Sequence, residues 1–185
     1  MAPALAVTLN ALGLYAIALV LIVAFAAQLI LHELPCPLCL LQRIQFALLA
    51  VGPVLNVRFG PRPSHYALSL LVAAAGAAFA MRQILLHIMP GDPGYGSELL
   101  GYHYYTWAFI GFAVAILALA AMLLFDGQFA GEKPPAEAEP AAFARAAVWL
   151  VIALAGLNVV ATLLECGFAA CPDDPVRYEL LNPGR

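Results

Sequence analysis

The chain has 185 residues, of which 64% are hydrophobic and only 10% are charged, and its mean hydropathy is +0.92. Soluble domains have about 25% charged residues, so this composition excludes a soluble globular protein and predicts an integral membrane protein. The small net charge of −3 gives no reason to expect a nucleic-acid partner.

Five apolar segments are long enough to cross a bilayer as helices, which takes about 20 residues each. The first segment is too long for the apolar core of a signal peptide, and no Lys or Arg lies in the first 42 residues, so we expect a retained helix. The backbone must bond to itself in lipid and the alternation of a β-barrel is absent, so the fold class is all-α. The five segments are residues 9–31, 39–57, 66–88, 105–125 and 144–164.

The loops between these segments predict the orientation of the chain in the membrane. Lys and Arg favour the cytoplasmic side of short loops. They occur in loops 56–65 and 126–145, and they are absent from loops 32–38 and 88–104. We therefore expect the first two loops inside the cell and the other two outside.

Four cysteines form two close pairs, Cys36 with Cys39 and Cys166 with Cys171. The first pair follows the first predicted helix and the second follows the fifth. An even number of crossings separates them, so we expect both pairs on the external side, where disulfides persist. Each pair closes a ring too small to add much stability through loop entropy. Redox chemistry and metal ligation are therefore the candidate roles.

The stretch from Cys36 to Arg43 predicts acidic thiols at a helix start. Proline favours the first helical position, so Pro37 places Cys36 near the N-cap and Cys39 in the first turn. Positive charge at a helix N-terminus lowers the pKa of a nearby thiol. Arg43 is four residues beyond Cys39, on the same helical face, where it would stabilise a thiolate. The alternative is a structural disulfide, with Arg43 extended toward the membrane interface.

The sequence PCPLCLLQR, residues 35–43, resembles the motif of the disulfide bond formation protein B (DsbB) family. DPGYGSELLGYHYYTWAF, residues 92–109, is also similar to that family, and the resemblance covers residues 9–125. It implies a four-helix bundle of DsbB type, to which this chain adds a fifth transmembrane helix. It also implies a membrane thiol oxidase that passes electrons to a quinone, ubiquinone or menaquinone.

The resemblance implies roles for three residues. Cys39 would meet the quinone, Cys36 would exchange with a second cysteine pair, and Arg43 would favour the reduced quinone. Arg82 and Gln83, near the outer end of the third segment, are further candidates to bind the quinone, because a charged residue at membrane depth is a functional hypothesis by default. Arg82 extending to the interface is the alternative.

The chain departs from the family at the second redox pair. In the family this pair lies between the third and fourth helices, but the loop 88–105 contains no cysteine here. We expect Cys166 and Cys171 to do the same work from the tail, or to form a structural disulfide. The resemblance implies two partners, a periplasmic DsbA-like thioredoxin-fold protein and the membrane quinone pool. It implies the bacterial cytoplasmic (inner) membrane as the location.

Three parts are predicted along the chain: a quinone and CxxC redox unit (1–125), a cytoplasmic linker (126–143), and a fifth helix with an external cysteine-containing tail (144–185). A vitamin K epoxide reductase-like quinone reductase is one alternative, although in that family the CxxC motif comes late in the chain. A structural or metal-binding membrane protein with a Cys₄ zinc site is another. An arginine beside the motif does not suit a cation, so we predict no metal site.

Overall fold

The computed structural model describes residues 1–130 and 140–181, and in this part of the chain five helical segments are long and apolar enough to cross a membrane. The prediction of an all-α membrane protein with five crossings is confirmed. A short antiparallel hairpin precedes α5, and a 3-10 helix follows it. The helices and strands are α1 (Pro3–Ile30), α2 (Pro37–Leu49), α3 (Val51–Phe59), α4 (Pro63–Leu86), β1 (Glu98–Leu99), β2 (Tyr102–His103), α5 (Tyr104–Leu123), η1 (Asp126–Gln128) and α6 (Ala142–Cys166).

Two helix ends differ from the prediction, and the second difference concerns a cysteine of the predicted site. α1 begins at Pro3 and not near residue 9, because a proline in the first turn starts the helix without losing a hydrogen bond. α6 continues to Cys166, which is therefore the last residue of a membrane helix and does not lie on the tail. Residues 131–139 of the predicted linker lie outside the described residues.

The second predicted segment consists of two helices, α2 and α3, which together make one crossing. Pro53 has no N–H, so the carbonyl of Leu49 loses its usual helical donor. The hydroxyl of Ser69 in α4 donates to this carbonyl at 2.9 Å. Gly52 permits the close approach of α4, because a Cβ there would collide with the His65 carbonyl and the Ser69 hydroxyl. The Leu49 carbonyl thus receives its hydrogen bond from the neighbouring helix α4.

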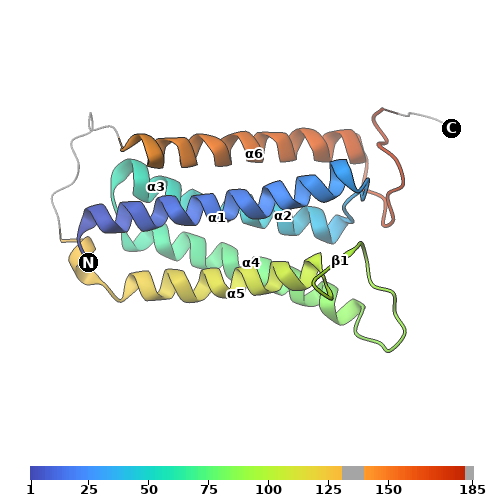
Figure 1. Ribbon diagram of the computed structural model, residues 1–185, viewed down its shortest axis with the longest axis horizontal. Helices are drawn as coiled ribbons and strands as arrows, with labels where there is room; N and C mark the ends of the chain where they lie inside the picture. The colour runs from blue at the N-terminus through green and yellow to red at the C-terminus, as the bar shows by residue number, and fades with distance from the viewer. Residues whose placement is uncertain (131–139, 182–185) are drawn as a thin grey trace.

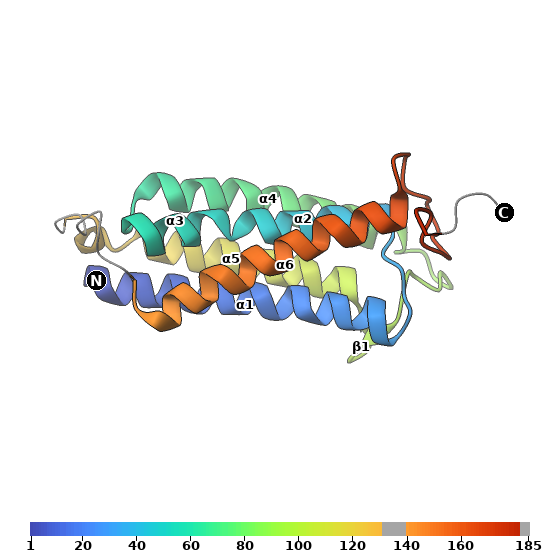
Figure 2. The ribbon, with the colours of Figure 1, turned by 90° about the horizontal axis from the view of Figure 1, so that it is seen from above.

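The helices pack as a bundle with α6 laid over one side. α4 packs along α5 and against α2, while α1 packs along α6 and against α3. Figure 2 shows α6 crossing obliquely over α1 and α2. In the core, the rings of Phe46 and Phe112 stack with their centroids 4.0 Å apart, and Gly76 leaves room for Phe112. Large apolar side chains on the outer faces of the helices are exposed, as lipid contact requires.

Buried polar side chains tie the helices together near the end of the bundle where the chain begins. The Asn10 amide donates to the Tyr66 hydroxyl at 2.7 Å, and the Asn56 amide donates to Asn10 at 2.9 Å. The Tyr66 hydroxyl donates in turn to Gln128 of η1 at 2.9 Å. These bonds fix α1, α3, α4 and η1 relative to one another.

The connections between the helices and the two termini are divided between the two ends of the bundle (Figure 1). The connections 31–36 and 87–103 and the tail beyond α6 lie at one end. The N-terminus and the connection after α5 lie at the other. Both cysteine pairs therefore belong to the same end of the molecule, as the parity of the predicted helices requires.

Candidate active site

Cys36 and Cys39 form a disulfide at the start of α2. Cys36 is the N-cap of this helix, and its Sγ accepts a hydrogen bond from the Cys39 N–H at 3.2 Å. Pro37 occupies the first helical position. The predicted arrangement of the motif on the helix is thus confirmed, and one N–H group of the first turn of α2 points at the Cys36 sulfur.

Gln83 supplies a second set of donors to the same disulfide. Its amide nitrogen lies 3.3 Å from the Sγ of Cys36 and 3.5 Å from the Sγ of Cys39. Gln42 donates to the amide oxygen of Gln83 at 2.7 Å, and both glutamines are buried. This bond turns the Gln83 amide so that its N–H groups face the sulfurs. Donors aimed at sulfur favour the negative charge that a reduced pair carries.

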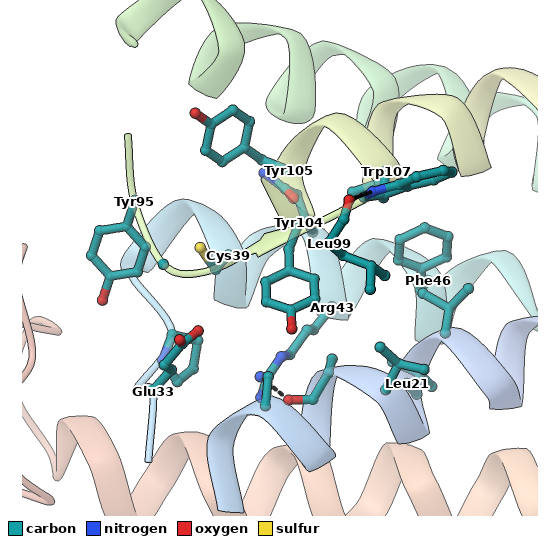
Figure 3. A pocket seen from close by; sticks show the side chains of 18 of the residues that line it. Leu21, Glu33, Cys39, Arg43, Phe46, Tyr95, Leu99, Tyr104, Tyr105 and Trp107 are labelled. Carbon is teal, nitrogen blue, oxygen red and sulfur yellow. Dashed lines mark hydrogen bonds between the residues drawn. The ribbon is translucent and has the colours of Figure 1, made fainter. Parts of the chain in front are cut away.

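A cavity of about 400 Å³ lies beside Cys39 (Figure 3). Residues of α1, α2, α5 and the loops above them line it, and most are apolar or aromatic. Figure 3 shows Cys39 and Arg43 on its wall, with Tyr104 and Trp107 contributed by α5. The volume is typical of small-molecule sites. We call this space the apolar cavity.

Arg43 is held rigidly at the wall of the apolar cavity. It is 8% exposed, and it donates to the Gln28 side chain at 2.6 Å and to the Ala24 carbonyl at 2.7 Å. Its guanidinium carbon lies 5.5 Å from the centre of the Phe25 ring. These contacts with α1 keep the side chain inside the bundle, so extension toward the interface does not describe Arg43. A fixed positive charge therefore stands one turn below Cys39.

A second cavity, of about 450 Å³, lies on the other side of the disulfide. Cys36 lines it, whereas Cys39 lines the apolar cavity. Arg82 and Gln83 also line this second space and do not line the first, so their contact with a quinone stays a prediction. Asp173, from the tail beyond α6, reaches the same space. We call it the thiol cavity.

Tyr95 stands between the two cavities and lines both of them. Its hydroxyl donates to the Leu34 carbonyl at 2.7 Å, which ties the loop before α5 to the loop before α2. Burial, reinforced by the negative charges of Asp174, Glu165 and Glu33, raises the pKa of Tyr95 to about 12. The phenol is thus a neutral donor at physiological pH.

Asp92 folds the same loop locally. Its carboxylate accepts hydrogen bonds from the Gly94 N–H at 2.8 Å and from His87 at 2.9 Å. These two bonds, that from Gly94 first, lower the pKa of Asp92. The loop above the cavities is therefore held by an ionised carboxylate.

The second disulfide joins Cys166 and Cys171. Cys166 is 6% exposed at the end of α6, and Gly167 makes the turn that follows with a φ of 64°, which favours glycine. The tail then folds back on α6: the backbone N–H groups of Glu179 and Leu180 donate to the carbonyls of the last helical turns at 3.1 and 3.0 Å. Residues 167–178 thus form a loop closed at both ends, which we call the disulfide loop.

Glu165 brings a carboxylate close to Arg43 from α6. Its side chain is 1% exposed, and neither carboxylate oxygen has a hydrogen-bond partner among the described residues. It interacts electrostatically with Arg43 without forming a close ion pair. Gln28 bonds to Arg43 and also donates to the Tyr178 hydroxyl at 3.1 Å. The apolar cavity is therefore connected electrostatically to the helix that carries the second disulfide.

The structure brings Cys36, Cys39 and Arg43 together as predicted, and it adds contacts that the sequence did not indicate. Gln28 could have been noticed as a polar residue inside an apolar segment. Tyr95 carried no such pattern, because its position depends on how its loop folds. In the described part of the chain, no three His, Cys, Asp or Glu side chains are grouped in a way that would hold a metal ion.

Comparisons with known proteins agree with the motif. The family model of disulfide bond formation protein DsbB matches residues 6–97. The chain is 41% identical over 86 residues to disulfide bond formation protein B of Xanthomonas axonopodis pv. citri, which covers 44% of this chain and 50% of that protein. It is 43% identical over 65 residues to disulfide bond formation protein B 2 of Burkholderia lata, which covers 35% of this chain and 39% of that protein.

These matches have a limited extent. The chain spans about half the length of the curated relatives that it matches. No solved structure matches it. The matched region nevertheless contains the CxxC motif, Arg43 and Gln83, which together surround the first disulfide. Residues 6–97 of this chain thus belong to the DsbB family, and the second cysteine pair lies outside the matched region, at the end of α6.

Proposed function

We propose that this protein is a quinone-dependent protein-disulfide oxidoreductase of the bacterial cytoplasmic membrane. It would reoxidise a DsbA-like thioredoxin-fold protein in the periplasm and pass the electrons to ubiquinone or menaquinone. The observation that carries the proposal is that the two cysteines of one disulfide line two different cavities. One cavity suits a lipid-borne acceptor, and the other is reached by the tail that holds the second disulfide.

The apolar cavity has the chemistry that a quinone needs. Its aromatic and aliphatic walls suit a flat apolar ring, and its few polar groups suit the ring carbonyls. Cys39 and Arg43 would contact the quinone, and the positive charge of Arg43 would favour the reduced form. A quinone bound there supplies an acceptor for two electrons and two protons. Arg82 and Gln83 are assigned to the thiol side, because they line the thiol cavity.

The electrons would enter through the second disulfide. The partner dithiol reduces Cys166–Cys171 and becomes a disulfide itself. The Cys171 thiolate then attacks the Sγ of Cys36: a Cys171–Cys36 bond forms, the Cys36–Cys39 bond breaks, and the electron pair leaves on Cys39. Cys166 next attacks Cys171, which restores the second disulfide and releases Cys36 as a thiolate. Two electrons have then moved from the partner to the first pair, and no other oxidant is needed.

The choice of Cys171 as the attacking thiol follows from its position. Cys166 is buried at the end of α6, whereas Cys171 is partly exposed on the disulfide loop. Asp173, two residues beyond Cys171, already lines the thiol cavity with Cys36. Two residues span at most about 7 Å, so Cys171 is close to that cavity.

The proposed orientation places both disulfides in the periplasm. The connection between α3 and α4 and the start of α6 lie at the opposite end of the bundle (Figure 1). Arg58 and Arg62 belong to the first of these regions and Arg145 to the second. Positive residues favour the cytoplasmic side. In this arrangement, residues 1–125 form the quinone and CxxC unit, residues 126–143 are a cytoplasmic linker, and residues 144–185 supply the shuttle pair.

Turnover by the purified full chain tests the proposal. The chain in detergent is mixed with a reduced thioredoxin-fold protein of DsbA type and a water-soluble quinone analogue, and the loss of quinone absorbance is followed. Replacing any one of the four cysteines by serine should abolish turnover, while Thr8→Ala, an exposed change at the far end of α1, should preserve it. Turnover that survives Cys36→Ser or Cys39→Ser would contradict the proposal.

Two other results would favour the alternatives. Loss of turnover for the first pair but not for Cys166→Ser or Cys171→Ser would make the second disulfide structural. Stoichiometric zinc in the purified protein, with no quinone reduction, would support a Cys₄ site.

A further inference from the structure

Arg82 places a positive charge at the thiol cavity near the outer end of α4. Its neighbour Gln83 bonds to both sulfurs, and both residues line the cavity that Cys36 also lines. Arg82 makes no hydrogen bond or ion pair within residues 1–130 and 140–181. A charged residue in a membrane helix is costly unless it is paired or functional. Its partner should therefore be sought in the same cavity.

Asp173 is the acidic side chain that lines this cavity. It is exposed, and it belongs to the disulfide loop, two residues beyond Cys171. The other ionisable groups of the cavity are engaged or neutral. His87 is bound to Asp92 at 2.9 Å, and Tyr95 is a neutral phenol. Arg82 and Asp173 thus face the same space with opposite charges, and they are not in ion-pair contact in this structure.

We propose that Arg82 and Asp173 form a charge pair that guides the disulfide loop onto Cys36. This inference rests on the proposed function, because it concerns the exchange between the two cysteine pairs. Both residues are positioning residues: they touch neither the quinone nor the reacting sulfurs. When Asp173 pairs with Arg82, Cys171 is drawn to the thiol cavity, where its thiolate attacks Cys36 and Cys39 leaves as the thiolate. Because both ends of the disulfide loop are anchored on α6, the pair only has to bias a short movement.

The approach of Cys171 to Cys36 can be measured without quinone or partner protein. In the full chain carrying Cys39→Ser and Cys166→Ser, only these two thiols remain. Equilibration with reduced and oxidised glutathione, followed by alkylation and mass spectrometry, gives the effective concentration of one thiol at the other. Arg82→Glu or Asp173→Lys should each lower it about fivefold, the ratio expected for losing a surface ion pair of about 1 kcal/mol.

The charge-swapped double variant Arg82→Glu/Asp173→Lys should restore the effective concentration. Asp174→Lys is the matched control, because it changes the adjacent acidic residue, which does not line the thiol cavity. It should change the logarithm of the effective concentration by less than about half as much as Asp173→Lys does. Raising the salt concentration should lower the value for the parent chain and leave Arg82→Gln unchanged, because screening acts only on paired charges. Arg82→Gln also removes the positive charge without adding a negative one, so it tests the pair even where Arg82→Glu fails to fold.

The inference is overturned if the two single changes add without rescue, or if Asp174→Lys acts as strongly as Asp173→Lys. Its failure is distinguishable from failure of the proposed function. Charge rescue in the glutathione assay with no quinone turnover would reject the function and keep the pair. Turnover that needs all four cysteines, with no charge rescue, would reject the pair alone.

Discussion

Gln83 offers the sharpest test of how the bundle activates its first disulfide. Gln83→Leu removes the amide nitrogen that lies 3.3 Å from the Cys36 sulfur and 3.5 Å from the Cys39 sulfur, and it fills the same space with apolar atoms. A hydrogen bond to a charged group is worth about 1.5–3 kcal/mol. Loss of one such bond makes a thiolate at least about tenfold harder to form, since 1.4 kcal/mol corresponds to a factor of ten. We therefore expect Gln83→Leu to raise the pKa of the Cys36 thiol.

The assay is the pH dependence of alkylation of Cys36 in a chain whose other three cysteines are serine. Gln83→Leu should move the midpoint upward by about one pH unit. Ser69→Ala is the matched control, because Ser69 is a buried polar residue of the same helix that bonds to Leu49 and not to sulfur. An unchanged midpoint in a folded Gln83→Leu chain would mean that Gln83 does not stabilise the Cys36 thiolate.

The same change has a separate effect on stability. It leaves the buried Gln42 amide without its acceptor, which costs about 1–3 kcal/mol of unfolding free energy. Gln42→Leu combined with Gln83→Leu removes both partners and should recover part of this loss. Unfolding in detergent measures it, and a double variant no more stable than Gln83→Leu alone would contradict the pairing.

Three further predictions concern the cavity wall, the helix packing and the outer loop. Arg43→Met should raise the KM for a quinone analogue about tenfold, through loss of a charged hydrogen-bond donor worth roughly 1.5 kcal/mol, as measured from the concentration dependence of quinone reduction; an unchanged KM would remove Arg43 from the site. Gly76→Leu should destabilise the protein by about 1–3 kcal/mol in thermal unfolding, because its Cβ would lie 2.5 Å from the Phe112 ring, whereas Gly156→Leu, with open space around it, should not. Asp92 has a lowered pKa, so its stabilisation of the loop is present above its unfolded pKa of about 3.9 and is lost as the pH falls through its folded value. Acid-protease cleavage of the loop should therefore increase below about pH 4 in the parent chain. Asp92→Asn lacks the ionised carboxylate, so its loop should be cleaved equally above and below this pH, and a parent chain that behaves in the same way would contradict the prediction.

Much of the fold was predictable because lipid imposes a simple length rule on helices. The apolar segments gave five crossings, and the order of the cysteines placed both pairs at one end. Pro37 also predicted the N-cap position of Cys36 correctly. The interruption at Ala50 was visible only in part: Pro53 indicated a lost hydrogen bond, but the compensating Ser69 is 16 residues away in sequence and on another helix.

The arrangement around the disulfide was much less predictable. Nothing in the motif indicates that Cys36 and Cys39 line different cavities, because this depends on where α4 and the loop of Tyr95 lie. The sequence grouped Arg82 with the quinone from its depth alone, whereas the structure puts it in the thiol cavity. Asp173 had no recognisable pattern, because its place at that cavity follows from the folding of the tail onto α6.

Peptide mapping of a Cys39→Ala chain in native membranes tests whether electrons pass between the two cysteine pairs. In this chain the Cys36 thiolate attacks the Sγ of Cys171 in the second disulfide: a Cys36–Cys171 bond forms, the Cys166–Cys171 bond breaks, and Cys166 leaves as a thiolate. No Cys39 is present to release Cys36 from this mixed disulfide. We expect a Cys36–Cys171 bond, with Cys166 free and open to alkylation from the periplasmic side. An intact Cys166–Cys171 bond beside a free Cys36 would contradict the transfer of electrons between the two pairs.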